Sequence, residues 1–352
     1  MPASRTFDLL NILGVSAHTG EYGSNSNTVA DAQYLGIRKW RDGINITSAV
    51  RTVYQSLYNA GIRFIGLPWP PGDPSVPNNI GYAENIASIG PGALFALEGP
   101  NEPGNFAFSY NGVNTANSWS AVAGFQHDWY AAVKADPNLS GVPVWTPSLV
   151  GQELDNWGLQ YLTVPAGPPA GENSAAGTVF ADAFNMHLYP MYQGQAQTID
   201  PTNGDSFVHV LAGDFVSTYA HGFAGYTLPV AQSFTRAITE FGYPATGGTA
   251  GGVTTDVPTQ GKNILNGLMN AWGEGLIAFT IYTFYEQGDG FGFAHRPWGP
   301  EGFRHLHAQF HDASERHGGK CGHVYAWVAE LFSQRITGDG QVSTIPEIER
   351  QL

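Results

Sequence analysis

The stretch LGIRKWRDGINITSAVRTVYQSLYNAGIRFIGLPW, residues 35–69, contains one complete unit of the pattern that decides the fold. Its two ends, residues 35–40 and 63–69, are short apolar segments rich in β-branched and aromatic residues, which is typical of strands. Between them, residues 46–61 place apolar side chains at helical spacing on one face. The stretch therefore predicts a strand, a helix and a second strand, the unit from which parallel sheets are built.

The same alternation runs along most of the chain, with further helical spacing at residues 118–134 and 259–275. The eight predicted strands are residues 9–15, 35–40, 63–69, 93–99, 142–149, 181–189, 236–242 and 276–284. Eight apolar strands joined by helices predict an α/β fold, a (β/α)8 TIM barrel with long loops on its C-terminal face. An open doubly wound sheet is the alternative, but GVSAHTGEYG (14–23) lacks the glycine spacing of a phosphate-binding loop.

The chain of 352 residues is long for one domain, but barrels of this length are common as single units. We therefore expect one catalytic barrel over residues 1–352. The tail, residues 294–352, differs in composition, because it holds six of the eleven histidines and the only cysteine, Cys321. Within it, residues 323–332 have helical spacing and are a candidate for the last barrel helix.

The composition argues against several classes of partner. Only 12% of the residues are charged, acidic residues outnumber basic ones 29 to 15, and no basic cluster occurs. We therefore expect no nucleic-acid partner and no membrane partner. No apolar run is long enough to cross a bilayer, and the N-terminus lacks the pattern of an export signal. An extracellular or periplasmic location is expected if such a signal has been removed.

Polar and aromatic residues follow the predicted strands where these end. The C-terminal ends of barrel strands converge on one pocket, so residues far apart in the sequence become neighbours there. The candidate site residues are His18, Arg41, Trp69, Asn101, Glu102, His187, Tyr189, Glu240, Tyr282 and Tyr285.

Two of these candidates are glutamates in apolar surroundings, in LEGPNEP (97–103) and AITEFGYP (237–244). A pair of carboxyls is sufficient for glycoside hydrolysis, because one protonates the leaving oxygen while the other attacks the anomeric carbon or activates water. The pair needs different environments, so that one carboxyl stays protonated near neutral pH and the other is ionised. Arg41 can hold Glu240 ionised by its charge, and Tyr189 can donate a hydrogen bond to the same carboxylate.

Other residues compete for these roles. Glu98, four residues before the first glutamate, and Glu286, at the end of the eighth predicted strand, are possible substitutes for the pair. Arg38 competes with Arg41, but strand alternation sends the two side chains to opposite faces, and we favour Arg41. Each glutamate also has a structural alternative, as a turn cap or as a member of a buried ion pair.

The motifs together, in this order, resemble clan A of the retaining glycoside hydrolases over about residues 8–290. Asn-Glu follows the fourth predicted strand, T-E-F-G lies at the seventh, Arg at the second and H-x-Y at the sixth. ITEFGYPATGG (238–248) is similar to the nucleophile segment of families 17 and 128. IRKWRDG (37–43) and NMHLYP (185–190) are more similar to families 39 and 5.

This resemblance implies a retaining hydrolase that cleaves a β-linked poly- or oligosaccharide by double displacement, with endo action suggested by the long loops. It implies that Glu102 is the general acid/base, Glu240 the nucleophile and Asn101 a partner of the sugar 2-hydroxyl. The residues that would orient and tune the carboxylates are Arg41, His187 and Tyr189. Retention further predicts that the two carboxyls lie about 5–5.5 Å apart.

The sequence departs from the clan pattern at the eighth strand, where many members place a tryptophan under the sugar. The aromatic residues available here are Tyr282, Phe284 and Tyr285. The loop NFAFSYNGVN (105–114) is predicted to line the leaving-group subsite. The aromatic content of 13% fits rings that pack against sugar C–H groups.

No metal or other cofactor is expected. His307 and His311 have a spacing that aligns two imidazoles on a helix, but no acidic residue lies between them as in H-E-x-x-H metal sites. Two alternative functions remain: a non-catalytic carbohydrate-binding barrel, and a metal-dependent barrel hydrolase that uses His18 and His187.

Overall fold

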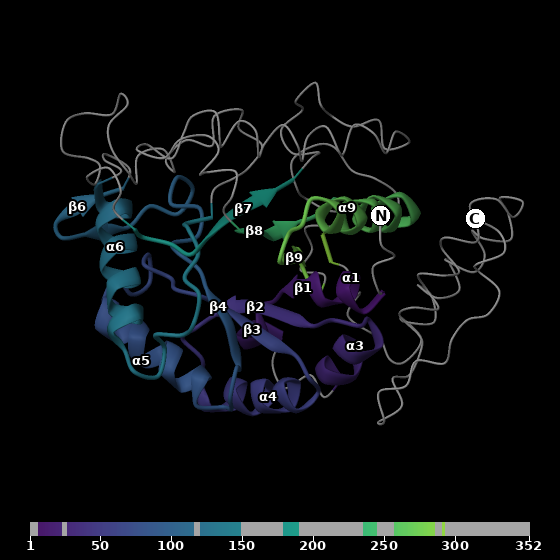
Figure 1. Ribbon diagram of the computed structural model, residues 1–352, viewed down its shortest axis with the longest axis horizontal. Helices are drawn as coiled ribbons and strands as arrows, with labels where there is room; N and C mark the ends of the chain where they lie inside the picture. Colours follow the sequence, from purple (N-terminus) through teal and green to yellow (C-terminus); the bar gives the residue numbers. More distant parts are fainter. Residues whose placement is uncertain are drawn as a thin grey trace, which may run out of the picture.

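The computed structural model describes residues 6–22, 27–115, 120–148, 179–189, 235–244, 257–285 and 291–292. Over these residues the chain has the α/β fold of a TIM barrel, in which a curled sheet of parallel strands is covered by helices on its outside (Figure 1). The strand order is β4-β3-β2-β1-β9-β8-β7. The strands are β1 (Leu13–Ser16), β2 (Lys39–Gly43), β3 (Arg63–Leu67), β4 (Leu94–Leu97), β7 (Ala183–Leu188), β8 (Thr235–Phe241) and β9 (Ala278–Ile281).

The remaining interval between β4 and β7 is bridged by residues 143–148, which we call the seam. The seam corresponds to the fifth predicted strand, but it makes isolated bridges instead of a ladder. The parallel bridges pair Leu97 with Val144, Trp145 with Ala183 and Asn101 with Ser148. Prolines at positions 143 and 147 remove two backbone donors, which explains why this segment does not continue as a regular strand.

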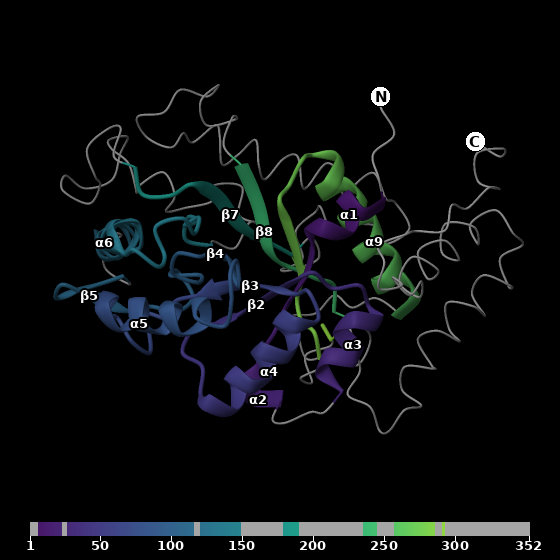
Figure 2. The same ribbon diagram turned by 60° about the horizontal axis from the view of Figure 1, so that its bottom comes forward.

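Helices flank the sheet in the order that the sequence predicts. Figures 1 and 2 show α3, α4 and α5 along the outside of β2, β3 and β4. The helices are α1 (Thr6–Ile12), α2 (Thr19–Tyr22), α3 (Thr28–Tyr34), α4 (Ser48–Asn59), α5 (Val76–Ala87), α6 (Ser120–Ala135) and α9 (Val257–Gly273), and a hairpin of β5 (Ser109–Tyr110) and β6 (Val113–Asn114) follows β4. The three helices predicted from apolar spacing are confirmed as α4, α6 and α9.

Two predicted strand boundaries are wrong. Most of residues 9–15 is helical, because α1 ends at Ile12 and packs against α9 and β9, and only β1 is extended. The second predicted strand begins at Lys39 rather than at residue 35, since Gly36, with φ of 70°, belongs to the turn that ends α3. The tail, including residues 323–332, lies outside the described residues.

The interior of the barrel is filled by a layer of small side chains around one large one. Four alanines, Ile65 and the indole of Trp145 form this cluster, and all six are buried. A larger apolar cluster lies between the sheet and the helices and includes Trp40, Phe64 and Trp129. Within the described part of the chain, no helix combines the length and the hydropathy that a membrane span requires.

Candidate active site

A cavity of about 640 Å³ opens where the strands end. Eight of the ten predicted site residues line it: His18, Arg41, Trp69, Asn101, Glu102, Tyr189, Glu240 and Tyr282. The other two, His187 and Tyr285, do not. The convergence that the barrel predicted from the sequence is therefore confirmed for most of the set.

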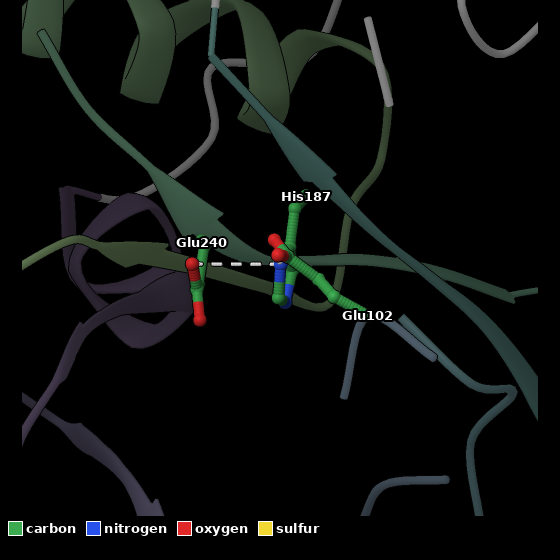
Figure 3. Close-up of side chains that lie close together, drawn as sticks. All are labelled: Glu102, His187 and Glu240. Carbon is green, nitrogen blue, oxygen red and sulfur yellow. Dashed lines mark hydrogen bonds and ion pairs between the residues drawn. The ribbon is translucent and has the colours of Figure 1, made fainter. Parts of the chain in front are cut away.

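Glu102 and Glu240 face each other across His187, as Figure 3 shows. The Nδ1 atom of His187 lies 2.6 Å from Oε1 of Glu102 and 3.4 Å from Oε2 of Glu240. One oxygen of each carboxylate lies within 4.8 Å of the other. The three side chains come from the end of β7, from β8 and from the turn after β4, so the barrel itself sets their spacing.

Arg41 of β2 is the centre of the buried polar network. Its Nη1 donates to Glu240 at 2.6 Å, its Nε donates to Glu98 at 2.7 Å, and its Nη2 donates to Asn101 at 2.6 Å. Burial lowers the pKa of Arg41, but the ion pairs with the two glutamates outweigh it and raise the pKa above its usual value. The guanidinium is therefore a fixed positive charge between the carboxylates of Glu98 and Glu240.

His187 lies between Arg41 and Glu102. Its Nε2 is 3.3 Å from Nη2 of Arg41. Its Nδ1 faces Oε1 of Glu102, and because a carboxylate only accepts, Nδ1 is the donor in this hydrogen bond. His187 is fully buried, which makes it a residue that orients the carboxylates from behind instead of one that lines the cavity.

Glu240 is 8% exposed and receives donors on both oxygens. Arg41 binds Oε1, and the hydroxyl of Tyr189 donates to Oε2 at 2.5 Å. Burial first, and then the charges of Glu240 and Glu102, raise the pKa of Tyr189 well above its usual value, so this hydroxyl stays protonated. Arg41 and Tyr189 thus occupy the places relative to Glu240 that the sequence predicted.

Glu102 has an unusual backbone. Its φ is 38°, in the left-handed region that side chains other than glycine rarely adopt, and such conformations gather at functional sites. The turn is held by two hydrogen bonds, from the backbone N–H groups of Asn105 and Phe106 to the carbonyl of Glu102, each 2.8 Å long. This turn directs the carboxyl into the cavity.

The pKa of the Glu102 carboxyl differs from the prediction. Burial raises the pKa of its carboxyl, but the hydrogen bond and the charge of His187, the hydrogen bond from Nδ2 of Asn105 and the charge of Arg41 together outweigh it and leave the pKa below its usual value. We expected one carboxyl of the pair to stay protonated near neutral pH, and Glu102 does not meet that expectation in the free protein. The reason is that its hydrogen-bond donors favour the carboxylate.

The aromatic candidates divide into two groups. Tyr282 lines the cavity, and its peptide bond to Thr283 is cis. Tyr285 is completely buried instead, and its hydroxyl donates to Oδ2 of Asp31 at 2.6 Å, so the prediction that it contacts substrate is corrected. Trp69 is 38% exposed and also lines the cavity.

Several lining residues were not predicted as site residues. Asp42 follows Arg41 and accepts hydrogen bonds from the backbone N–H groups of Thr19, at 2.9 Å, and Gly43, at 2.8 Å. Phe291 packs edge-on against Tyr189 and Tyr282, with ring centroids 5.4 and 5.8 Å away. Of these residues, only Asp42 could have been predicted from the sequence, because it directly follows Arg41.

Glu98 does not replace either glutamate. It is completely buried, and both of its carboxylate oxygens accept from Arg41. Its position in the fourth predicted strand allows an inward side chain. Its pairing with Arg41 could not be predicted from the sequence, because that pairing depends on the register between β2, β3 and β4. Glu286, His307 and His311 lie outside the described residues.

The loop after Glu102 only partly lines the cavity. Asn105 and Phe106 do so, whereas Phe108 is 4% exposed and packs against Phe125. The hydroxyl of Tyr110 donates to Asp128 at 2.5 Å, on α6. The prediction that residues 105–114 face a ligand therefore narrows to the first two residues.

Among the described residues, Glu102, His187 and Glu240 form the one group whose geometry could hold a metal ion. The charge of Arg41, 2.6 Å from Oε1 of Glu240, opposes a cation there. The same arrangement suits acid–base and nucleophilic chemistry, because it places two carboxylates on either side of one cavity with separate donors for each.

Comparison with known proteins adds evidence about the fold. The sequence matches no protein-family model, and no curated protein has a similar sequence. The structure is similar to a β-1,3-glucanosyltransferase of glycoside hydrolase family 17 from Rhizomucor miehei, with a TM-score of 0.54 and 12% identity over 80% of this chain and 92% of that chain. An active-site mutant of that enzyme in complex with laminaritriose matches with the same TM-score and identity.

A family 39 glycoside hydrolase from the gut symbiont Bacteroides cellulosilyticus is also similar, with a TM-score of 0.50 and 13% identity. The match covers 82% of this chain and 61% of that chain. At these identities the likeness shows a shared barrel fold. Families 17 and 39 are both among those that the motifs resemble.

Proposed function

We propose that the protein is a glycoside hydrolase that cleaves a β-linked glycan by double displacement with retention of configuration. The observation that carries the proposal is the approach of the two carboxylates, one oxygen of each lying within 4.8 Å of the other. Retaining enzymes hold their carboxyls about 5–5.5 Å apart, whereas inverting enzymes separate them by about 6.5–9.5 Å to admit a water molecule. The close approach of the two oxygens is compatible with the shorter separation and supports direct attack by one carboxylate.

Glu240 is the proposed nucleophile. Its two oxygens accept hydrogen bonds from Arg41 and Tyr189, which orient the carboxylate for attack on the anomeric carbon. Glu102 gives its proton to the leaving oxygen as the bond breaks, and it later takes a proton from the water that hydrolyses the glycosyl-enzyme. Because donors lower the pKa of Glu102, its protonated form is most populated in acid.

The substrate class is proposed from the cavity and the neighbours together. The rings of Trp69, Phe106, Tyr189 and Tyr282 line the cavity and suit pyranose faces, and we assign to Asn101, held by Arg41, the binding of a sugar hydroxyl beside the carboxylates. The family 17 neighbour is described as a β-1,3-glucanosyltransferase, so β-1,3-glucan oligosaccharides are the first substrates to test. Endo action is part of the proposal, as the long loops in the sequence suggest.

Intact-mass labelling tests the proposal directly. The protein is incubated with activated 2-deoxy-2-fluoro β-glycosides of gluco, manno and xylo configuration, and peptide mapping locates any adduct. We expect one adduct, on Glu240, and none in Glu240→Gln. Glu84→Gln, a substitution on α5, is the control and should label like the parent protein.

Other outcomes have distinct meanings. An adduct on Glu98 or Glu102 would overturn the assignment of the nucleophile. Glycan binding without any adduct or turnover would favour a non-catalytic carbohydrate-binding barrel. Turnover that is lost on chelation and recovered with added metal would favour the metal-dependent alternative.

A further inference from the structure

Large apolar side chains that remain exposed are informative when they cluster. Six such residues occur in the described part of the chain: Tyr34, Trp69, Phe106, Val113, Val179 and Met269. Only Trp69 and Phe106 line the cavity, where they are 38% and 42% exposed. Their ring centroids lie 5.1 Å apart with an angle of 57° between the planes, so they form one continuous apolar surface.

The indole of Trp69 is held by the turn that follows β3. The carbonyl of Trp69 accepts hydrogen bonds from the N–H groups of Gly72 and Asp73, both at 2.9 Å. A Cβ atom at Gly72 would lie 2.8 Å from Cδ1 of the indole, so the ring packs where only glycine leaves room. Asp73 also accepts from Ser75 and Asn78, which ties the turn to the start of α5.

Phe106 is held by the turn of Glu102 itself. Its backbone N–H donates to the carbonyl of Glu102 at 2.8 Å, and the preceding residue, Asn105, donates its side-chain amide to the carboxylate at 2.9 Å. The backbone that carries this ring is therefore tied to the turn that carries the acid. Both rings are positioned before any ligand arrives, which reduces the entropy lost on binding.

The position of the two rings relative to the carboxylates defines which sugar they meet. Tyr189 binds Glu240 and Tyr282 lies beside it, so these residues border the sugar that is attacked. Phe106 belongs to the turn of Glu102, and Trp69 packs against Phe106, so both rings border the cavity on the side of Glu102, the proposed proton donor to the glycosidic oxygen. That oxygen belongs to the departing part of the glycan.

We propose that Trp69 and Phe106 form the subsite for the leaving sugar, and that the same surface receives a sugar acceptor when the glycosyl-enzyme is resolved by transfer. The ligand class is a pyranose residue of a β-linked oligosaccharide, with its C–H face against the rings. The inference rests on the proposed function and adds the residues that select the leaving group.

Leaving groups of different size test this subsite. Cleavage of laminaritetraose releases a sugar fragment as the leaving group, whereas the fluoride ion released from β-glucosyl or β-laminaribiosyl fluoride is too small to reach the two rings. We expect Trp69→Ala and Phe106→Ala each to lower kcat/KM for laminaritetraose about tenfold. Hydrolysis of the fluorides should stay within about twofold of the parent protein, which also shows that the variants fold. Trp69→Phe should restore most of the loss.

Met269→Ala, at an exposed apolar side chain on α9, is the matched control and should change neither substrate. With a laminaribiose acceptor in excess, the ratio of transfer to hydrolysis should fall in both ring variants. Equal losses on tetraose and fluorides, or no loss on either, would overturn the subsite while leaving the hydrolase intact. A parent protein that turns over neither substrate would instead overturn the proposed activity on β-glucans and the subsite with it.

Discussion

Replacing Arg41 with methionine should destabilise the protein strongly, because it leaves buried carboxylates without their cation. Arg41 is 4% exposed and Glu98 is completely buried, so solvent cannot replace the lost ion pair. Removing one partner of a buried pair costs about 3–5 kcal/mol. Arg41→Met should therefore lower the free energy of unfolding by about that amount, measured by urea denaturation at neutral pH with coincident fluorescence and circular dichroism transitions.

A second substitution tests the cause. In Arg41→Met combined with Glu98→Gln, the stranded charge is gone, so we expect the double variant to recover at least about 1–2 kcal/mol relative to Arg41→Met. Arg63→Met on β3 is the control, since Arg63 donates only modest hydrogen bonds to backbone carbonyls in the structure, and it should cost about 1 kcal/mol. A loss under about 1 kcal/mol for Arg41→Met, or strictly additive effects in the double variant, would refute this reasoning.

Three further predictions concern separate parts of the molecule. Asn105→Ala removes a donor from the Glu102 carboxylate and so raises its pKa, which should move the alkaline limb of the kcat/KM profile to higher pH; a limb that stays or moves down would contradict the assigned acid. Burial lowers the pKa of Lys39 to about 8 from 10.5, so the unfolded chain binds more protons between these values and stability rises with pH through that window. Lys39→Met should therefore stabilise the protein at pH 7 by up to about 3 kcal/mol, with a gain in urea denaturation that shrinks by pH 10; a constant difference would count against it. Gly99→Ala places a Cβ 2.1 Å from Oε1 of Gln126 and should lower the unfolding free energy by about 1–3 kcal/mol or more, whereas Gly81→Ala on α5, where nothing lies within 4 Å, should be neutral or stabilising.

The sequence was most informative where periodicity and strand ends coincide. Strand alternation sends Arg38 and Arg41 to opposite faces, and the favoured Arg41 does face the barrel interior. Glu102 and Glu240 were paired from their settings at two strand ends, and the barrel brings them together. These inferences succeed because a parallel strand fixes both the direction of a side chain and the end at which it emerges.

The same rules fail outside regular strands. The sequence LLNI (9–12) is compatible with a strand or with a turn of helix. The packing of α1 against α9 and β9 stabilises the helix. Tyr282 and Tyr285 have similar local settings, but the chain leaves β9 at Ile281 and the alternation no longer applies, so only the first tyrosine reaches the cavity. The pKa of Glu102 depends on donors from β7 and from its own turn, which no single stretch of sequence reveals.

Because of the seam at residues 143–148, the backbone near Glu102 is held by fewer sheet hydrogen bonds than the backbone of Glu240. It borders β4, which precedes Glu102, and β7, which carries His187, and it holds both strands through a few bridges. Glu240 instead lies on β8, which forms ladders with β7 and β9 on its two sides, each with one register shift near the site. Substitutions in the seam should therefore act more directly on Glu102, the proposed proton donor, than on Glu240, the proposed nucleophile. The seam is thus a place where the pH dependence of the proposed reaction could be altered with less effect on the attacking group.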